Sequence, residues 1–342
     1  MTLATVMAGV ILVALVAYAI TGGADFGGGV WDFLATGPRR VAQRKLIADA
    51  IAPIWEANHV WLIIVIVLLF SCFPRVFADL SIALHVPVSL MLIGIVLRGS
   101  AFIFRAYDSK RDEVQQRWSR IFALASIITP LLLGASIGAV AGGGVTRSLQ
   151  LLDRGASSMS ELVMQIAIRS WLTPFALAVG LLTLASFAWL AAVYLCGEAK
   201  DDALRNDFRT RALWTLAILA ALMIVTPTLA RAQAERLFYE LMGQWWSAPY
   251  VAITAIAALV AAWALWARHF AIARTAAPAV VALILGGWAL AQYPYLIPDR
   301  WTIDTAAAPP ITLELVLGAV VVGSLLLFPS LFYLMRVFKA RG

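Results

Sequence analysis

The chain has 342 residues, of which 62% are hydrophobic and only 13% are charged. A soluble domain carries roughly 25% charged residues and lacks recurrent apolar stretches of about 20 residues. The composition therefore excludes a soluble globular enzyme, and the alternating segments of about ten residues that build a membrane β-barrel do not occur. The net charge of +7 comes from basic residues clustered in particular loops, which indicates membrane topology and not a nucleic-acid partner.

Apolar stretches long enough to cross a bilayer as helices recur from one end of the chain to the other. We predict an all-α, polytopic membrane protein, a single integral-membrane domain over residues 1–342 with about nine transmembrane helices. The loops after the odd-numbered helices carry most of the lysines and arginines, which places the N-terminus outside and the C-terminus in the cytoplasm. The predicted spans cover residues 3–22, 50–72, 80–104, 120–141, 171–195, 211–230, 248–268, 276–293 and 311–336.

Charged residues inside these spans are the strongest functional signal, because a charge in the bilayer costs about 3 kcal/mol and usually marks an ion or proton path. Asp25 is the first of them, in the glycine-rich segment GGADFGGGVWD of residues 22–32. Gly23 and Gly27 favour close packing against another helix, but packing alone does not require a carboxylate. Asp25 is expected near the cytoplasmic end of its span, where water can reach it.

Two further acids, Asp49 and Glu56, lie seven residues apart at the predicted second span. On one helix they would share a face and be separated by about 10 Å along the axis. Pro53 between them frees a backbone carbonyl that can bind water. Asp49 also fits the simpler role of an acid that stabilises a helix N-terminus, and Glu56 fits the role of a partner in a static buried ion pair. A series of acids that leads inward from the cytoplasmic edge favours a proton relay instead.

One buried cation and one histidine lie near these acids. Arg98, late in the third span, falls in the same cytoplasmic half and is a candidate counter-ion for Glu56 or Asp25. His59 follows Glu56 by three residues and is expected to hydrogen-bond beside the acids. The chain has only three histidines, and they are too dispersed to predict a haem or metal site.

Several segments, taken in order, resemble subunit II of the cytochrome bd-type quinol oxidases. The segment GGADFGGGVWD resembles the family's Gly-Phe-Asp-x-Gly-x-Gly element, and IAPIWEANHVWLI resembles its Ala-Pro-x-Trp-Asp-Gly-Asn-x-Val-Trp-Leu element. The likeness continues through LFSCFPRVFA, VLRGSAFIFR, and YPYLIPD with the following TIDTAAAPPITLEL. It therefore extends over most of the chain.

This resemblance implies a haem-free, nine-helix subunit that pairs with a haem-bearing subunit I of homologous fold in the bacterial cytoplasmic membrane. In this family subunit I carries the b- and d-type haems and the quinol site and reduces oxygen to water. Subunit II closes the complex and supplies part of a proton path from the cytoplasm, so this chain alone holds no complete active site. No cofactor or metal is expected in the chain itself, and the sequence leaves open whether a structural quinone, membrane lipid or small accessory subunits also bind.

The resemblance also assigns residues. Asp25 and Arg98 match the family's first-span Asp and third-span Arg, and Asn58 matches directly. Glu56 stands where many members have Asp, and His59 where Gln or Glu is usual. Together with the reasoning above, this predicts a proton path, not bond chemistry, formed by Asp25, Glu56, Asp49, Asn58, His59 and Arg98.

Two other functions fit part of the sequence. A proton-coupled secondary transporter would place its acids at the membrane midplane and would show inverted repeats; the acids here are off-centre, and no repeat of fixed period is evident. A purely structural membrane subunit, whose acids form inert ion pairs, would have the same partner and would differ only in the effect of replacing those acids.

Overall fold

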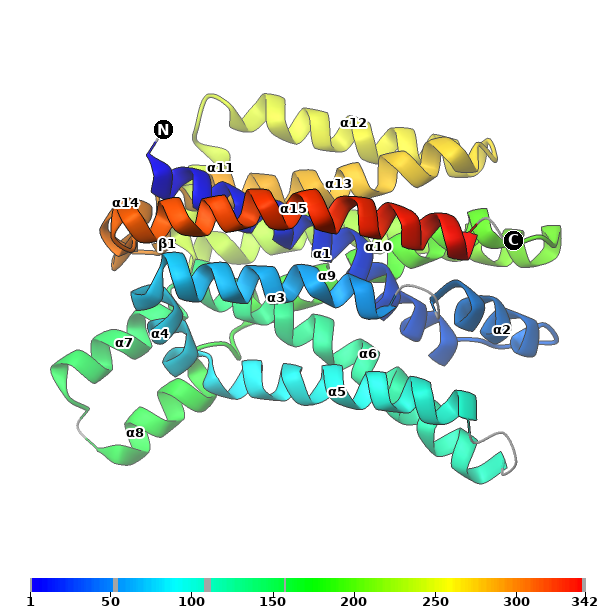
Figure 1. Cartoon of the computed structure of the whole chain (residues 1–342), viewed down its shortest axis with the longest axis horizontal. Coiled ribbons are helices and arrows are strands. Elements are labelled where there is room, and N and C mark those ends of the chain that lie inside the picture. Colours follow the sequence, from blue (N-terminus) through cyan, green and yellow to red (C-terminus); the bar gives the residue numbers. More distant parts are fainter. Residues whose placement is uncertain (1, 52–54, 108–111, 157, 340–342) are drawn as a thin grey trace.

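The computed structural model describes residues 2–51, 55–107, 112–156 and 158–339, apart from the side chains of residues 55–56, 105–107, 112–115, 334–335 and 338–339. Long helices lie side by side along one axis of the molecule (Figure 1). The helices are α1 (Leu3–Phe33), α2 (Arg40–Ile51), α3 (Trp55–Cys72), α4 (Pro74–Ala83), α5 (His85–Tyr107), α6 (Asp112–Ala141), α7 (Gly144–Arg154), α8 (Met159–Met164), the π-helix η1 (Gln165–Arg169), α9 (Pro174–Glu198), α10 (Asp202–Gln233), α11 (Glu235–Met242), α12 (Ser247–Trp266), α13 (Phe270–Gln292), α14 (Ile303–Ala306) and α15 (Pro310–Lys339), and the strands are β1 (Tyr295–Ile297) and β2 (Trp301–Thr302).

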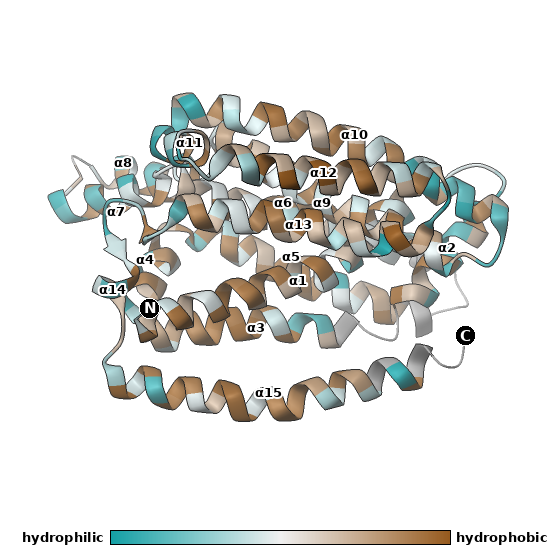
Figure 2. Cartoon of the chain, turned by 90° about the horizontal axis from the view of Figure 1, so that it is seen from above, coloured by the Kyte–Doolittle hydropathy of each residue, from teal (hydrophilic) through white to brown (hydrophobic). Residues whose placement is uncertain are grey.

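The all-α, multi-pass prediction is confirmed. In the described part of the chain, eight helices are long and apolar enough to cross a membrane, or up to nine if α3 and α4, bent by 117° at their junction, form one broken span. Hydrophobic residues cover the middle of the bundle and hydrophilic residues gather at its two ends (Figure 2). This is the distribution that a bilayer requires. The orientation of the chain in the membrane stays a prediction.

Helix α9 lies in the middle of the bundle, where it packs against α1, α6, α10 and α13. It begins at Pro174 with Thr173 as its N-cap, whose side chain accepts a hydrogen bond from the backbone N–H of Ala176 at 3.1 Å. Its central turns are almost completely buried, and Trp189 and Leu190 are among the most buried side chains of the protein. The largest hydrophobic cluster therefore forms around α9, with residues of α1 on one side of it.

Helix α1 is longer than predicted, because it does not end at residue 22 but continues through the glycine-rich segment to Phe33. Each glycine in a helix costs about 1 kcal/mol relative to alanine, but here the glycines allow close contact with α9. A Cβ atom at Gly27 would lie only 1.9 Å from the backbone oxygen of Phe187, and one at Gly23 would meet the Phe187 ring at 2.5 Å. Tertiary packing thus outweighs propensity, and Asp25 lies inside a helix and not at its end.

The predicted second span is divided, and this corrects the predicted series of acids. Asp49 belongs to α2, which ends at Ile51, whereas Glu56 belongs to the first turn of α3, which begins at Trp55. The two acids are therefore not on one helix, and the prediction of a shared face is wrong. The prediction assumed one continuous helix across Pro53, a residue type that interrupts helices in general, and Pro53 itself lies outside the described residues.

A polar network closes the end of the bundle where α1 begins. The guanidinium of Arg300 donates hydrogen bonds to Asp79 at 2.6 Å and to Asp153 at 2.5 Å, and the indole N–H of Trp301 also donates to Asp79. The hydrogen bond to Asp153 is the main cause that raises the pKa of Arg300 above its usual value. These bonds tie the short β1–β2 hairpin to α4 and α7 and fix the connection between α13 and α15.

Candidate functional site

Asp25 is the centre of the candidate site. Its side chain is only 4% exposed, in the middle of the stretch of α1 that packs against α9. The side-chain amide of Asn58, on α3, donates a hydrogen bond of 2.6 Å to Oδ2 of Asp25 and a longer one of 3.5 Å to the backbone oxygen of Thr21. The amide therefore joins α3 to α1 at the carboxylate and stabilises its charged form.

Arg98 supplies a buried positive charge from α5. It is 2% exposed, and its Cζ atom lies 4.6 Å from the ring centroid of Phe26 and 5.4 Å from that of Phe122. Aromatic faces attract cations, and the attraction grows when water is removed. Arg98 also interacts electrostatically with Asp25. Among the described residues, its Nε and Nη2 atoms have no hydrogen-bond partner, so the guanidinium keeps donors that water could use.

His59 also lies at this site, half-buried on α3. Its ring centroid is 6.1 Å from that of Tyr18, in a tilted arrangement, and 6.1 Å from that of Phe26, in an edge-to-face arrangement. The ring of Phe26 is thus shared between His59 and Arg98. The structure thus brings together four of the predicted residues from α1, α3 and α5, namely Asp25, Asn58, His59 and Arg98.

The other two predicted residues do not join this cluster in the structure. Asp49 is exposed on α2, and it is absent from the lining of the pocket described below. The side chain of Glu56 lies outside the described part of the chain, so its predicted role beside Arg98 stays a prediction. No group of three or more His, Cys, Asp and Glu side chains that could hold a metal ion occurs among the described residues.

A pocket of about 360 Å³ connects Asp25 and Asn58 to the end of the bundle. Helices α1, α2, α3 and α9 contribute most of its wall, and α13 and α15 contribute one residue each. At its outer part, Arg274 pairs with Glu198, with Nη2 and Oε1 3.3 Å apart. The pocket is lined by Ile20, Thr21, Ala24, Asp25, Gly28, Ile47, Ala50, Ile51, Asn58, Trp61, Ala191, Tyr194, Leu195, Glu198, Arg274 and Leu331.

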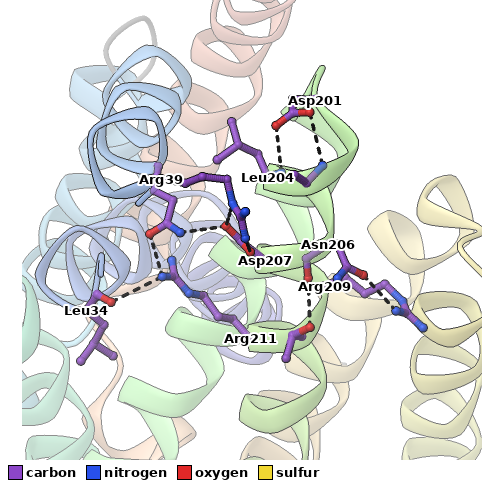
Figure 3. A network of polar contacts seen from close by, with 11 residues as sticks. Leu34, Arg39, Asp201, Leu204, Asn206, Asp207, Arg209 and Arg211 are labelled. Atoms are coloured by element: carbon purple, nitrogen blue, oxygen red, sulfur yellow. Dashed lines mark hydrogen bonds and ion pairs between the residues drawn. The ribbon is translucent and has the colours of Figure 1, made fainter. Parts of the chain in front are cut away.

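Helix α2 forms one wall of this pocket and is fixed by polar contacts with α10 (Figure 3). Asp207 accepts hydrogen bonds from Nε and Nη2 of Arg39, at 2.8 and 2.6 Å, and from the side-chain amide of Gln43 at 2.9 Å. Arg211 donates to Gln43 at 2.8 Å and to the backbone oxygen of Leu34 at 3.4 Å. Because these bonds join the end of α1, the start of α2 and α10, they hold α2 against the bundle.

Sequence reasoning missed several polar residues of this region. Asp32 is completely buried in the last turn of α1, seven residues after Asp25, and Nε of Arg44 lies 3.9 Å from its Oδ1. The seven-residue spacing that relates Asp49 to Glu56 also relates Asp25 to Asp32, and it could have identified Asp32 from the sequence. Glu198 and Arg274 gave no such signal, because each lies next to a predicted loop, where a charged residue is ordinary.

Comparisons with known proteins agree with this architecture. The family model described as "Cytochrome bd terminal oxidase subunit II" matches residues 3–338. A Bacillus subtilis (strain 168) protein assigned as a cytochrome bd menaquinol oxidase subunit II is 22% identical over 330 residues, covering 94% of this chain and 91% of that protein. The cytochrome bd-I ubiquinol oxidase subunit 2 of Escherichia coli (strain K12) is 29% identical over 217 residues, covering 62% of this chain and 52% of that protein. The bd oxidase structure from Geobacillus thermodenitrificans contains a chain that matches with a TM-score of 0.75 and 22% identity, covering 99% of both chains.

Proposed function

We propose that this chain, which belongs to the cytochrome bd terminal oxidase subunit II family, conducts protons from the cytoplasm to the oxygen-reducing centre of its oxidase. Membership makes it a multi-pass membrane subunit of a quinol oxidase complex in which subunit I is its partner. The finer role is our proposal: the chain is haem-free, lies in the bacterial cytoplasmic membrane with its N-terminus outside, and leaves the b- and d-type haems to subunit I.

The observation that carries this proposal is the buried Asp25 carboxylate, hydrogen-bonded by Asn58 at a pocket that extends to the end of the bundle. A carboxylate inside a membrane helix is expensive, and helix packing at the glycines would be equally good without it. A buried acid with a route to water can accept a proton from one side and release it to the other. Nearby Arg98 favours the charged form between transfers.

The expected chemistry is proton transfer between oxygen atoms, and each residue has a separate part in it. The carboxylate of Asp25 accepts and releases the proton, and the amide of Asn58 holds that carboxylate toward the pocket. Arg98 stabilises the negative charge left when the proton moves on. Oxygen reduction that consumes protons from the cytoplasm, while quinol releases its own protons outside, would generate a proton-motive force without a pump.

The test is the Asp25→Asn variant of the complete, purified oxidase. The amide keeps the size and the polarity of the side chain but cannot carry a proton, so we expect oxygen consumption with quinol to fall by roughly a hundredfold, the size of effect typical when a proton-transfer group is removed. Haem absorbance and the yield of the two-subunit complex should stay normal. The matched control is Asp299→Asn, an acid at the opposite end of the bundle that pairs with Arg236. Normal turnover of Asp25→Asn would instead favour a purely structural subunit.

A further inference from the structure

We infer that the 360 Å³ pocket is a water-filled access chamber for protons, and that the Glu198–Arg274 ion pair forms its mouth. The inference rests on the proposed proton role of Asp25 and adds the route by which protons arrive there. It assigns functions to residues of α9, α13 and α2 that lie outside the predicted cluster of acids.

The packing of α1 on α9 gives the length of this chamber. Gly23 faces Phe187 and Gly27 faces both Phe187 and Ala191, so the two helices run in the same direction. Asp25 therefore lies near the level of residue 189, and Glu198 is the last residue of α9. Nine residues of helix correspond to about 13 Å. The pocket thus extends from a buried carboxylate to the end of a membrane-spanning helix.

The volume of the chamber is sufficient for a chain of water molecules over this distance. Water occupies about 30 Å³ per molecule in the liquid, so 360 Å³ holds on the order of ten molecules. At a hydrogen-bond spacing of about 2.8 Å, four or five of them would connect the two ends. Purely apolar cavities stay dry, but this one has polar groups at both ends, with Asp25 and Asn58 inside and Tyr194, Glu198 and Arg274 outside.

Small side chains in the wall keep this space open. Ala24 of α1, Ala50 of α2 and Ala191 of α9 all line it, so the wall carries methyl groups where longer side chains would take up part of the space. The α2 side of the wall is held in place by the hydrogen bonds of Arg39 and Gln43 to Asp207. The fold therefore maintains a cavity where close packing would otherwise be expected.

The mouth has the properties of a site that collects protons. The side chains of Arg274 and Glu198 are 43% and 37% exposed, and such a pair is worth only about 0–1 kcal/mol, so it opens readily. The guanidinium of Arg274 also lies 5.9 Å from the ring of Tyr194, which keeps the cation at the mouth when the pair opens. A proton passes from hydronium to the Glu198 carboxylate, then along the waters to Asp25, and only O–H bonds break and form.

Accessibility is tested with single cysteines in the complete oxidase, in a background where the two native cysteines, both buried, are replaced by alanine. Ala50→Cys places a thiol in the chamber, and a charged, membrane-impermeant thiosulfonate reagent is added to inside-out vesicles. We expect labelling within about tenfold of the rate of Ala42→Cys, on the exposed surface of the same helix. Ala255→Cys, exposed on α12, faces lipid by the predicted topology and should react at least a hundredfold more slowly. Labelling of Ala50→Cys as slow as that of Ala255→Cys would mean a dry pocket, or one filled by lipid or quinone, and would overturn the inference.

Function is tested on the same labelled protein, so that folding is not in question. Filling the chamber at Ala50→Cys with a bulky reagent should lower oxygen consumption at least fivefold with unchanged haem absorbance, and labelled Ala42→Cys should be unaffected. Glu198→Gln should slow turnover at least threefold, and a small weak acid such as formate should restore it. If labelling at Ala50→Cys and Glu198→Gln both leave turnover unchanged while Asp25→Asn lowers it, protons arrive by another route and only this inference fails. If Asp25→Asn itself has normal turnover, the proposed function fails.

Discussion

Replacing Gly27 with alanine tests how closely α1 must approach α9 for the site to form. The added Cβ atom would lie 1.9 Å from the backbone oxygen of Phe187 and 2.8 Å from the Cβ atom of Ala191. Because Cβ atoms essentially never come within 3.0 Å of such neighbours, the two helices must separate by about 1 Å. Overpacking of this kind costs about 1–3 kcal/mol, and the better helix propensity of alanine returns about 1 kcal/mol. Because the clash is with a backbone atom, we take the upper end of the overpacking range, about 3 kcal/mol, and expect a net destabilisation of about 2 kcal/mol.

The assay is thermal inactivation of the purified oxidase, followed by loss of quinol-dependent oxygen consumption. Gly9→Ala is the matched control, since it lies in the same helix and its added Cβ atom would meet nothing within 4 Å. The control should inactivate at the wild-type temperature or slightly above, and Gly27→Ala several degrees below. Turnover of Gly27→Ala should also fall, because Asp25 lies two residues from the displaced contact. Equal inactivation temperatures for the two variants would refute the close approach of α1 and α9.

The remaining predictions concern single polar side chains. Glu56→Gln is expected to lower oxidase turnover while haem content and assembly stay normal, and unchanged turnover would exclude a proton role for Glu56. Asp49→Asn should leave turnover near the wild-type value, because Asp49 is exposed on α2 and does not line the pocket; a loss comparable to that of Asp25→Asn would restore the predicted relay through α2. Arg39→Ala should lower the inactivation temperature at low salt and much less at 1 M salt, because an exposed ion pair is screened; a loss independent of salt would contradict this.

The sequence predicted the membrane class, most of the spans and the buried charged residues Asp25 and Arg98, because each of these depends on a local and strong signal. An apolar stretch of 20 residues has few alternatives to a membrane helix. A charge within such a stretch is costly enough to need a reason. Asn58 was found only through the family resemblance, since nothing local distinguishes a single polar residue in an apolar helix.

The errors came from places where neighbouring chain segments decide the structure. The first span was ended at residue 22 because about 20 apolar residues suffice to cross a bilayer, whereas the helix continues to Phe33 through glycines that pack against Phe187. Asp49 was placed beside Glu56 because helix periodicity was continued across Pro53. The pocket could not be predicted, because it is bounded by residues from distant parts of the chain, from Ile20 to Leu331.

The arrangement around Asp25 also explains why its direct hydrogen-bond partner is the amide of Asn58 and not the guanidinium of Arg98. A bidentate contact with Arg98 would hold the carboxylate charged and oppose protonation. In the structure, the guanidinium instead rests on the rings of Phe26 and Phe122, and Asn58 makes the direct hydrogen bond. The positive charge is then close enough to stabilise the carboxylate after it releases a proton, but it does not occupy the oxygen that must receive the next one. A static ion pair would favour direct contact between the guanidinium and the carboxylate, so the hydrogen bond that Asn58 donates to Asp25 argues for transfer over mere neutralisation.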